Sequence, residues 1–129
     1  MIQDKDFTIR LIRQFIQALD RLILGKPEES LMQKELDYDS LLKDIFSLSF
    51  DDLIASSNED LNSLILKHEE KNQKDYYELL GNLFYFKGKE ENNSTYLQRS
   101  SHFYTLYLEK SKIYSLPILT RISEIAKEL

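Results

Sequence analysis

The chain has 129 residues, 42% of them hydrophobic, and a net charge of −5, which fits one folded domain over residues 1–129. It has no cysteine, so disulfide bonds and thiolate chemistry are excluded. Three glycines and two prolines leave few residues for tight turns, so the composition favours an all-α protein over a sheet-rich one.

Charge is unevenly placed along the chain. Residues 1–64 hold 7 basic and 13 acidic residues, whereas residues 65–129 hold 10 basic and 9 acidic residues. Neither half offers the excess of basic residues that a nucleic-acid surface needs, so we expect no nucleic-acid partner. The first residues lack the pattern of a secretory signal, and charges interrupt the most apolar stretch, so we expect a cytoplasmic protein that does not enter the membrane.

The first predicted helix covers about residues 5–24 and is apolar over most of its circumference. Its polar residues recur at steps of three and four and form one narrow stripe: Arg10, Arg13, Gln14, Gln17, Asp20 and Arg21. An ordinary surface helix has a narrower apolar face than this one. We therefore expect the helix to be covered on more than one side, either by its own chain or by a second copy in a homodimer. Self-association would then use Phe7, Leu11, Phe15 and Leu22.

Gly25 and Pro27 separate this helix from a second one, predicted over about residues 28–46. Its apolar face would be formed by Leu31, Tyr38, Leu41, Leu42 and Ile45.

Two short helices are predicted next. Ser49 and Asp52 have the spacing of a capping box, which would start a helix carrying Leu53 and Ile54. Asn58 could cap a further helix carrying Leu61, Leu64 and Ile65.

In the second half of the chain, residues 68–74 are polar and are predicted to form an exposed turn or a solvated helix end. Helices are predicted over about 75–87, 95–115 and 117–128, with a loop over 88–94 and a break at Pro117. The sequence thus predicts a helical bundle of about five to six helices.

One stretch resembles a known repeat. The residues Tyr77, Leu80, Gly81, Phe84 and Gly88 have the spacing of the first helix of a tetratricopeptide repeat, and Ser100 and Tyr104 can fill the roles of its second helix. The resemblance implies a tetratricopeptide-like helical hairpin at residues 75–115, with a longer loop than the repeat has. The layout is also similar to that of uncharacterised small bacterial all-helical proteins that end in one such hairpin. This resemblance implies a fold rather than an activity.

No catalytic or metal-binding motif is present. His68 lacks a second histidine four residues later, the carboxylates show no paired pattern, and the glycines stand too far apart for a phosphate loop. We therefore expect no cofactor, no metal and no catalytic residue. Arg99 and His102, three residues apart on one helical face, are the polar pair that could bind an anion.

Aromatic residues are concentrated late in the chain. Ten of the fifteen lie between residues 76 and 114: Tyr76, Tyr77, Phe84, Tyr85, Phe86, Tyr96, Phe103, Tyr104, Tyr107 and Tyr114. Core packing is favoured over a tyrosine-lined groove, because aromatic stripes on helices are usually buried.

Two functions stay open on this sequence. The favoured one is a non-catalytic protein–protein interaction module that binds a protein partner and self-associates through its first helix. The alternative is a small-ligand-binding protein, or an enzyme of an unfamiliar class, with a pocket between helices. The residues predicted to bind a partner or ligand are Arg99, His102, Tyr104 and Tyr107.

Overall fold

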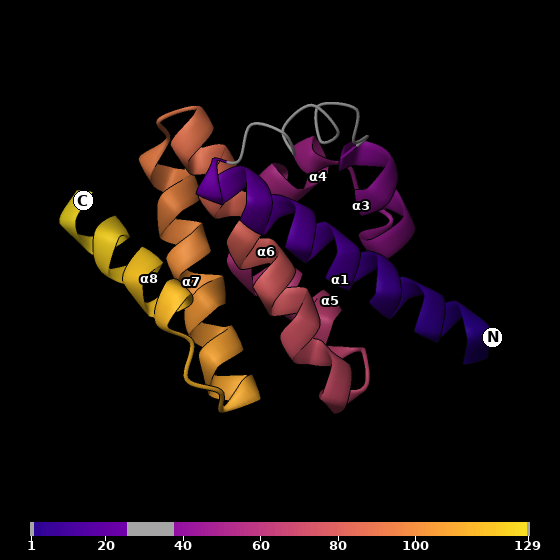
Figure 1. Cartoon of the computed structure of the whole chain (residues 1–129). Coiled ribbons are helices and arrows are strands. Elements are labelled where there is room, and N and C mark those ends of the chain that lie inside the picture. The colour runs from indigo at the N-terminus through magenta and orange to yellow at the C-terminus, as the bar shows by residue number, and fades with distance from the viewer. Residues whose placement is uncertain (1, 26–37, 129) are drawn as a thin grey trace. The chain divides into compact units, whose positions relative to one another are not determined.

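A computed structural model describes residues 2–25 and 38–128, with side chains from residue 7 onward (Figure 1). Over these residues the chain forms seven α-helices and no β-strand, which confirms the all-α prediction and exceeds the predicted number of helices. No helix in these ranges is long and apolar enough to span a membrane. The contacts divide the chain into two compact units, Met1–Glu69 and Glu70–Leu129, and the single domain stays a prediction.

The first unit is built on the long helix α1 (Ile2–Leu24), which packs against α3 (Tyr38–Phe46). The rings of Phe15 and Tyr38 lie 5.6 Å apart at this contact. The buried apolar residues of the two helices follow the predicted spacing: Ile12, Phe15, Ile16, Leu19, Leu42 and Ile45. The predicted helix over 28–46 is confirmed from Tyr38 onward, and its earlier part, with Leu31, lies outside the described residues.

Hydrogen bonds at their N-termini fix the two short helices of this unit. At α4 (Phe50–Ala55), the Ser49 hydroxyl accepts from the backbone N–H of Asp52 at 3.1 Å, and the Asp52 carboxylate accepts from the backbone N–H of Ser49 at 3.1 Å. This confirms the capping box. The hydrogen bond from the Ser49 backbone N–H, followed by a side-chain hydrogen bond from Ser49, lowers the pKa of the Asp52 carboxyl. The carboxylate of Asp39, on α3, accepts from the backbone N–H of Phe50 at 3.0 Å and so ties α3 to α4.

The start of α5 (Asn58–Leu66) corrects one prediction. Asn58 is the first helical residue, and the cap is Ser57, whose hydroxyl accepts from the backbone N–H of Asp60 at 3.0 Å. The residue that caps a helix N-terminus typically has an extended backbone, and Ser57 has one, with φ −74° and ψ 164°.

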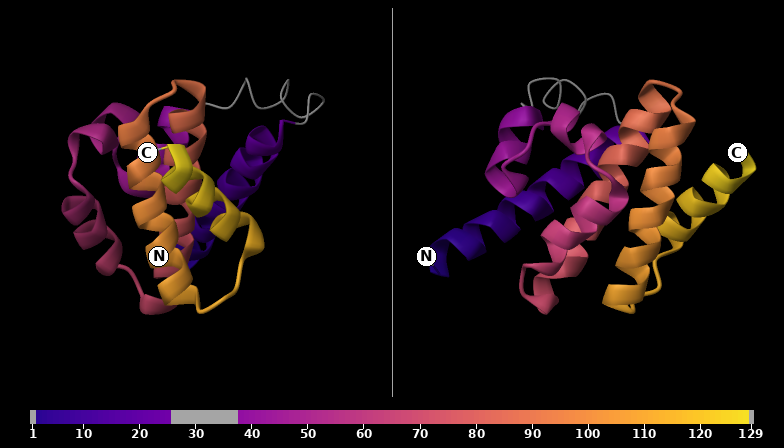
Figure 2. Two further views of the ribbon diagram at one scale, coloured as in Figure 1. Left: turned by 90° about the vertical axis from the view of Figure 1, so that its left-hand side faces the viewer. Right: turned by 180° about the vertical axis from the view of Figure 1, so that it is seen from behind.

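The second unit consists of α6 (Glu70–Glu90), α7 (Ser94–Ser111) and α8 (Leu116–Glu128). Helices α6 and α7 run antiparallel side by side, and α8 packs against α7 (Figure 2). A short turn joins α6 to α7, where the side chain of Asn93 caps α7 by accepting from the backbone N–H of Tyr96 at 3.1 Å. Seven of the ten aromatic residues between 76 and 114 are buried, as core packing predicts.

Three predicted boundaries in this unit were wrong. Helix α6 begins at Glu70 rather than near residue 75, so most of the polar stretch 68–74 is a helix end, the second of the two predicted alternatives, although Gln73 within it is buried. The same helix continues through Gly88, which was predicted to open a loop; here Gly88 packs tightly against Leu97. Helix α7 stops at Ser111, because Lys112 adopts a left-handed backbone with φ 56° and closes the helix.

Gly81 sets the separation of α6 and α7. A Cβ atom placed on Gly81 would lie 2.4 Å from Cδ1 of Tyr104 on α7, closer than two non-bonded carbon atoms can approach. Next to this contact, the Ser100 hydroxyl donates to the carbonyl oxygen of Gly81 at 2.7 Å. The small residue therefore lets the two helices pack closely at this point.

We predict that Gly81→Ala destabilises the protein. Alanine gains helix propensity of about 1 kcal/mol, but overpacking costs about 1–3 kcal/mol. Since two ring carbons of Tyr104 would lie less than 3.0 Å from the added Cβ, we expect the upper end of this cost and a net loss of about 2 kcal/mol. Thermal or urea unfolding followed by circular dichroism measures it. The control is Gln98→Ala on the exposed side of α7, which should change the stability by less than about 0.5 kcal/mol. A stability of Gly81→Ala equal to or above wild type would contradict the close packing.

Candidate functional site

Three buried polar side chains, one from each helix of the second unit, meet between the helices. We call Asn82 of α6, Tyr104 of α7 and Arg121 of α8 the polar cluster. Tyr104 donates its hydroxyl hydrogen to Oδ1 of Asn82 at 2.5 Å. The guanidinium of Arg121 donates to the same oxygen at 3.0 Å and to the Tyr104 hydroxyl oxygen at 3.1 Å. The three groups therefore form a closed ring of hydrogen bonds.

The polar cluster is sealed from solvent. Asn82 and Tyr104 are 0% exposed and Arg121 is 8% exposed. A buried guanidinium, amide or hydroxyl is costly unless it is hydrogen-bonded, and charge-assisted hydrogen bonds such as those of Arg121 are the stronger kind. The cluster thus offsets its own burial and fixes α8 on the α6–α7 pair.

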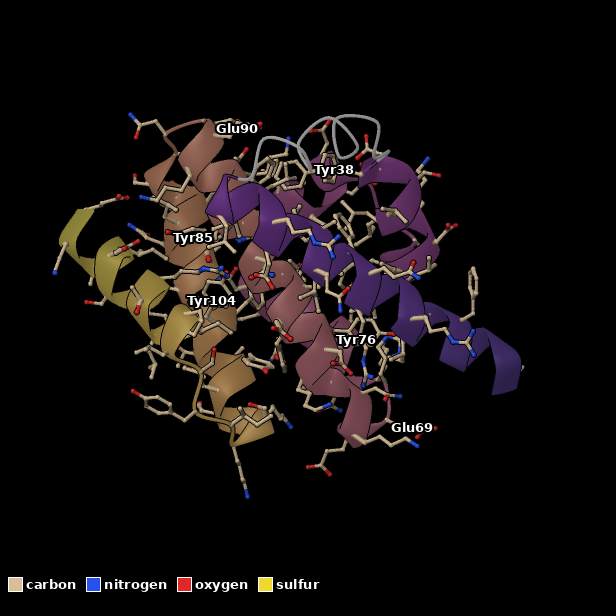
Figure 3. All side chains as sticks on the ribbon, in the orientation of Figure 1. Tyr38, Glu69, Tyr76, Tyr85, Glu90 and Tyr104 are labelled. Carbon is tan, nitrogen blue, oxygen red and sulfur yellow. The ribbon has the colours of Figure 1, made fainter. Side chains whose placement is uncertain are left out.

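Tyr85 lies beside the polar cluster, with its ring centre 6.3 Å from that of Tyr104. Both residues are labelled in Figure 3. Its hydroxyl donates to Oε2 of Glu124 on α8 at 3.1 Å, and the guanidinium carbon of Arg121 lies 5.5 Å from the centre of its ring. Burial, together with the hydrogen bond to Glu124, raises the pKa of Tyr85 to about 12. Tyr85 therefore adds a second link between α6 and α8, and its hydroxyl stays protonated at neutral pH.

The chemistry of this arrangement is structural. The Tyr85 hydroxyl ionises far above neutral pH, so it is a poor general base there, and the polar groups of the cluster are bonded to one another. Among the side chains of residues 7–25 and 38–128, no group of histidines, aspartates or glutamates is arranged to hold a metal ion. The arrangement can therefore hold three helices together.

The four residues predicted to bind a partner or ligand have different surroundings. Tyr104 belongs to the buried polar cluster, and Tyr107 is also buried. The guanidinium of Arg99 lies 4.6 Å from the centre of the Phe84 ring, and partial burial lowers its pKa. His102 is exposed, with its ring edge against Phe103. The structure thus places Arg99 and Tyr104 against different neighbours, and the ligand-binding role stays a prediction.

The four residues predicted to mediate self-association differ in exposure. Phe7 is 59% exposed, Leu11 and Leu22 are half-buried, and Phe15 is 2% exposed with its ring against Tyr38. Of these residues, Phe7 offers the most surface to a second molecule.

An exposed apolar segment was missed by the sequence analysis. Ile113 and Tyr114, in the connection between α7 and α8, are 53% and 78% exposed, and Leu116, the first residue of α8, is 61% exposed. We call residues 113–116 the apolar turn. The sequence clue is Pro117, because a helix break so close to these residues takes them out of the helical pattern that would bury an apolar face.

Asn82 and Arg121 were also missed, although Arg121 has a recognisable spacing. It lies three residues after Ile118 and four before Ile125, so it falls on the buried face of α8. A charged residue in the middle of an apolar stripe indicates a buried polar partner. Asn82 has a similar spacing, three residues after Leu79 and three before Tyr85, but its partners lie on two other helices and cannot be identified from its own segment.

We predict that Arg121→Met destabilises the protein by about 2 kcal/mol, since methionine fills a similar space but cannot donate to Asn82 and Tyr104. Chemical unfolding monitored by circular dichroism gives the difference from wild type. The matched control is Lys127→Met, an exposed position on the same helix, which should stay within about 0.5 kcal/mol. Equal stabilities of the two variants would show that the polar cluster does not hold α8.

We also predict a pH dependence that comes from Tyr85. Because its folded pKa is raised from 10.0 to about 12, the unfolded chain loses this proton first, and the stability falls as the pH rises from 10 to 12. The loss due to Tyr85 is about 2 kcal/mol. Urea unfolding of wild type and Tyr85→Phe across this range measures it, after the difference at about pH 8 has been subtracted. An equally steep decline in Tyr85→Phe would contradict the assignment.

We compared the chain with models of protein families, with curated proteins and with solved structures, and found no match. Any function must therefore be argued from the residues described above.

Proposed function

We propose that this protein is a non-catalytic protein–protein interaction module. The observation that carries the proposal is the contrast within its second unit. The polar cluster consists of groups bonded to one another, whereas the apolar turn places three large apolar side chains more than half in solvent. Neighbouring exposed apolar residues are typical of surfaces that bind another protein.

In this proposal, the α6–α7 pair serves as a tetratricopeptide-like hairpin that forms the rigid part of the module. The close approach at Gly81 and the burial of Ser100 and Tyr104 support it, because the resemblance assigns the small and aromatic roles to these positions. The stacked rings of Phe84 and Phe103, 6.0 Å apart, add aromatic packing between the same two helices.

We further propose that two copies associate through α1 and that Phe7 is the principal contact. An exposed phenylalanine is favourable to bury against a second molecule, because its ring carries a large apolar area. A homodimer would use the same surface on both copies, so one substitution changes both sides of the contact.

One capture experiment tests both parts. A tagged chain is produced beside an untagged copy in the cells that contain the protein, and bound proteins are quantified by mass spectrometry. We expect the untagged copy and at least one other protein to be recovered with wild type. Phe7→Glu should reduce recovery of the untagged copy at least about fivefold, since truncating a central apolar contact has effects of this size. Gln14→Glu adds the same charge at another exposed position of α1 and serves as the control.

The outcomes separate the two parts. If no untagged copy is recovered, self-association through α1 is wrong, although another recovered protein would still support an interaction module. If neither the untagged copy nor any other protein is enriched over an unrelated tagged protein, the proposed function is wrong.

A further inference from the structure

We propose that the apolar turn, residues 113–116, together with Lys110 and Lys112, is a docking site for an acidic, apolar segment of a partner protein. The inference rests on the proposed function and names the class of partner. Three features of the second unit support it: the exposure of the apolar side chains, the hydrogen bonds that hold the turn, and the local charge. The net charge of the whole chain is a fourth argument.

The exposed side chains lie next to residues that do belong to the core. Tyr107, at the end of α7, and Ile118, in the first turn of α8, are buried. Between them, Tyr114 is 78% exposed and Leu116 is 61% exposed, and these are the two most exposed of the large apolar side chains in the segment. The unit thus completes its own packing without these side chains, and their apolar surface remains available to another molecule.

Local hydrogen bonds hold the backbone of the turn. The backbone N–H of Lys112 donates to the carbonyl oxygen of Leu108 at 3.0 Å, and that of Ile113 donates to the Ser111 hydroxyl at 3.2 Å. On the other side, the Ser115 hydroxyl accepts from the backbone N–H of Ile118 at 3.4 Å. A backbone that is already ordered loses little conformational entropy when a partner binds.

The charge around the turn differs from that of the whole chain. Lys110 and Lys112 are exposed, and residues 110–123 contain no acidic residue, whereas the chain as a whole carries −5. Glu109 is the nearest acidic residue before this stretch. Two exposed lysines directly before exposed apolar residues are complementary to a segment that carries acidic and apolar side chains. Tyr114 is the expected anchor, because exposed tyrosine often dominates such contacts.

The net charge favours a protein segment over an anionic membrane. An anionic bilayer repels a chain with a net charge of −5. A short protein segment meets only the charges near the turn, because screening limits electrostatic interactions to about 8 Å at physiological salt.

The test is a selection from a display library of random peptides on the purified full-length protein. We expect the enriched peptides to combine apolar and acidic residues. For the best peptide, labelled and measured by fluorescence anisotropy, Tyr114→Ser with Leu116→Ser should weaken binding at least about tenfold. The matched control is Leu66→Ser, which removes a half-exposed leucine from α5 and should leave the affinity unchanged.

Charge reversal gives a second, independent readout. Lys110→Glu with Lys112→Glu should weaken binding of the acidic peptide about fivefold and reduce its dependence on salt, since attraction between exposed charges is screened by salt. Lys127→Glu, an exposed lysine on α8, is the control. Circular dichroism of each variant confirms that the helices are intact, and the substituted side chains are exposed, so folding should be retained.

Several results would overturn the proposal. Enrichment of basic peptides, the absence of any enriched peptide, or binding that persists in Tyr114→Ser with Leu116→Ser would exclude this docking site. Binding of phosphatidylserine vesicles by wild type and not by that variant would identify a membrane site instead. A contact between two copies would be identified if light scattering gives wild type a mass above that of one 15.3 kDa chain and gives Tyr114→Ser with Leu116→Ser a lower mass. The capture experiment decides the proposed function separately, so the two can fail independently.

Discussion

The second unit depends on the hydrogen bonds that Arg121 makes to Asn82 and Tyr104. Helix α8 buries few apolar residues, among them Ile118 and Ile125, so apolar packing alone gives it a small contact with its neighbours. A guanidinium taken out of water is costly unless it is bonded, and here its bonds are satisfied only when α8 lies where it does. The cluster therefore selects one position for α8, and with it the position of the turn that precedes the helix.

This arrangement begins with the absence of a side chain at Gly81. Because the ring of Tyr104 lies directly against that residue, α7 comes close enough for the Tyr104 hydroxyl to reach Asn82 in the next position of α6. The paired oxygen atoms then form the acceptor for Arg121. A methyl group at residue 81 would push the ring away, so close helix packing and polar bonding are coupled in this unit.

The sequence predicted those features that depend on neighbouring residues. The capping box at Ser49 was predicted correctly because both of its partners lie within four residues, and the helical segments were predicted because their apolar spacing is regular. The polar cluster could not be predicted in the same way. Asn82 and Arg121 lie 39 residues apart in sequence, and nothing in either segment shows that their helices meet. The exposure of Tyr114 likewise depends on where α8 turns back.

Two features of this unit depart from the usual burial of apolar groups and exposure of polar ones: its buried polar residues and its exposed apolar residues. They have different energetic consequences. The free-energy cost of burying Asn82 and Arg121 is offset within the chain, because hydrogen bonds inside the protein replace the hydrogen bonds to water that are lost. Exposing Tyr114 and Leu116 is not offset in the isolated chain, because apolar surface in contact with water costs about 25 cal/mol per Å². A second molecule that covers these side chains would remove that cost. Since the exposed Lys110 and Lys112 directly precede these residues, we propose that this molecule is an acidic, apolar protein segment.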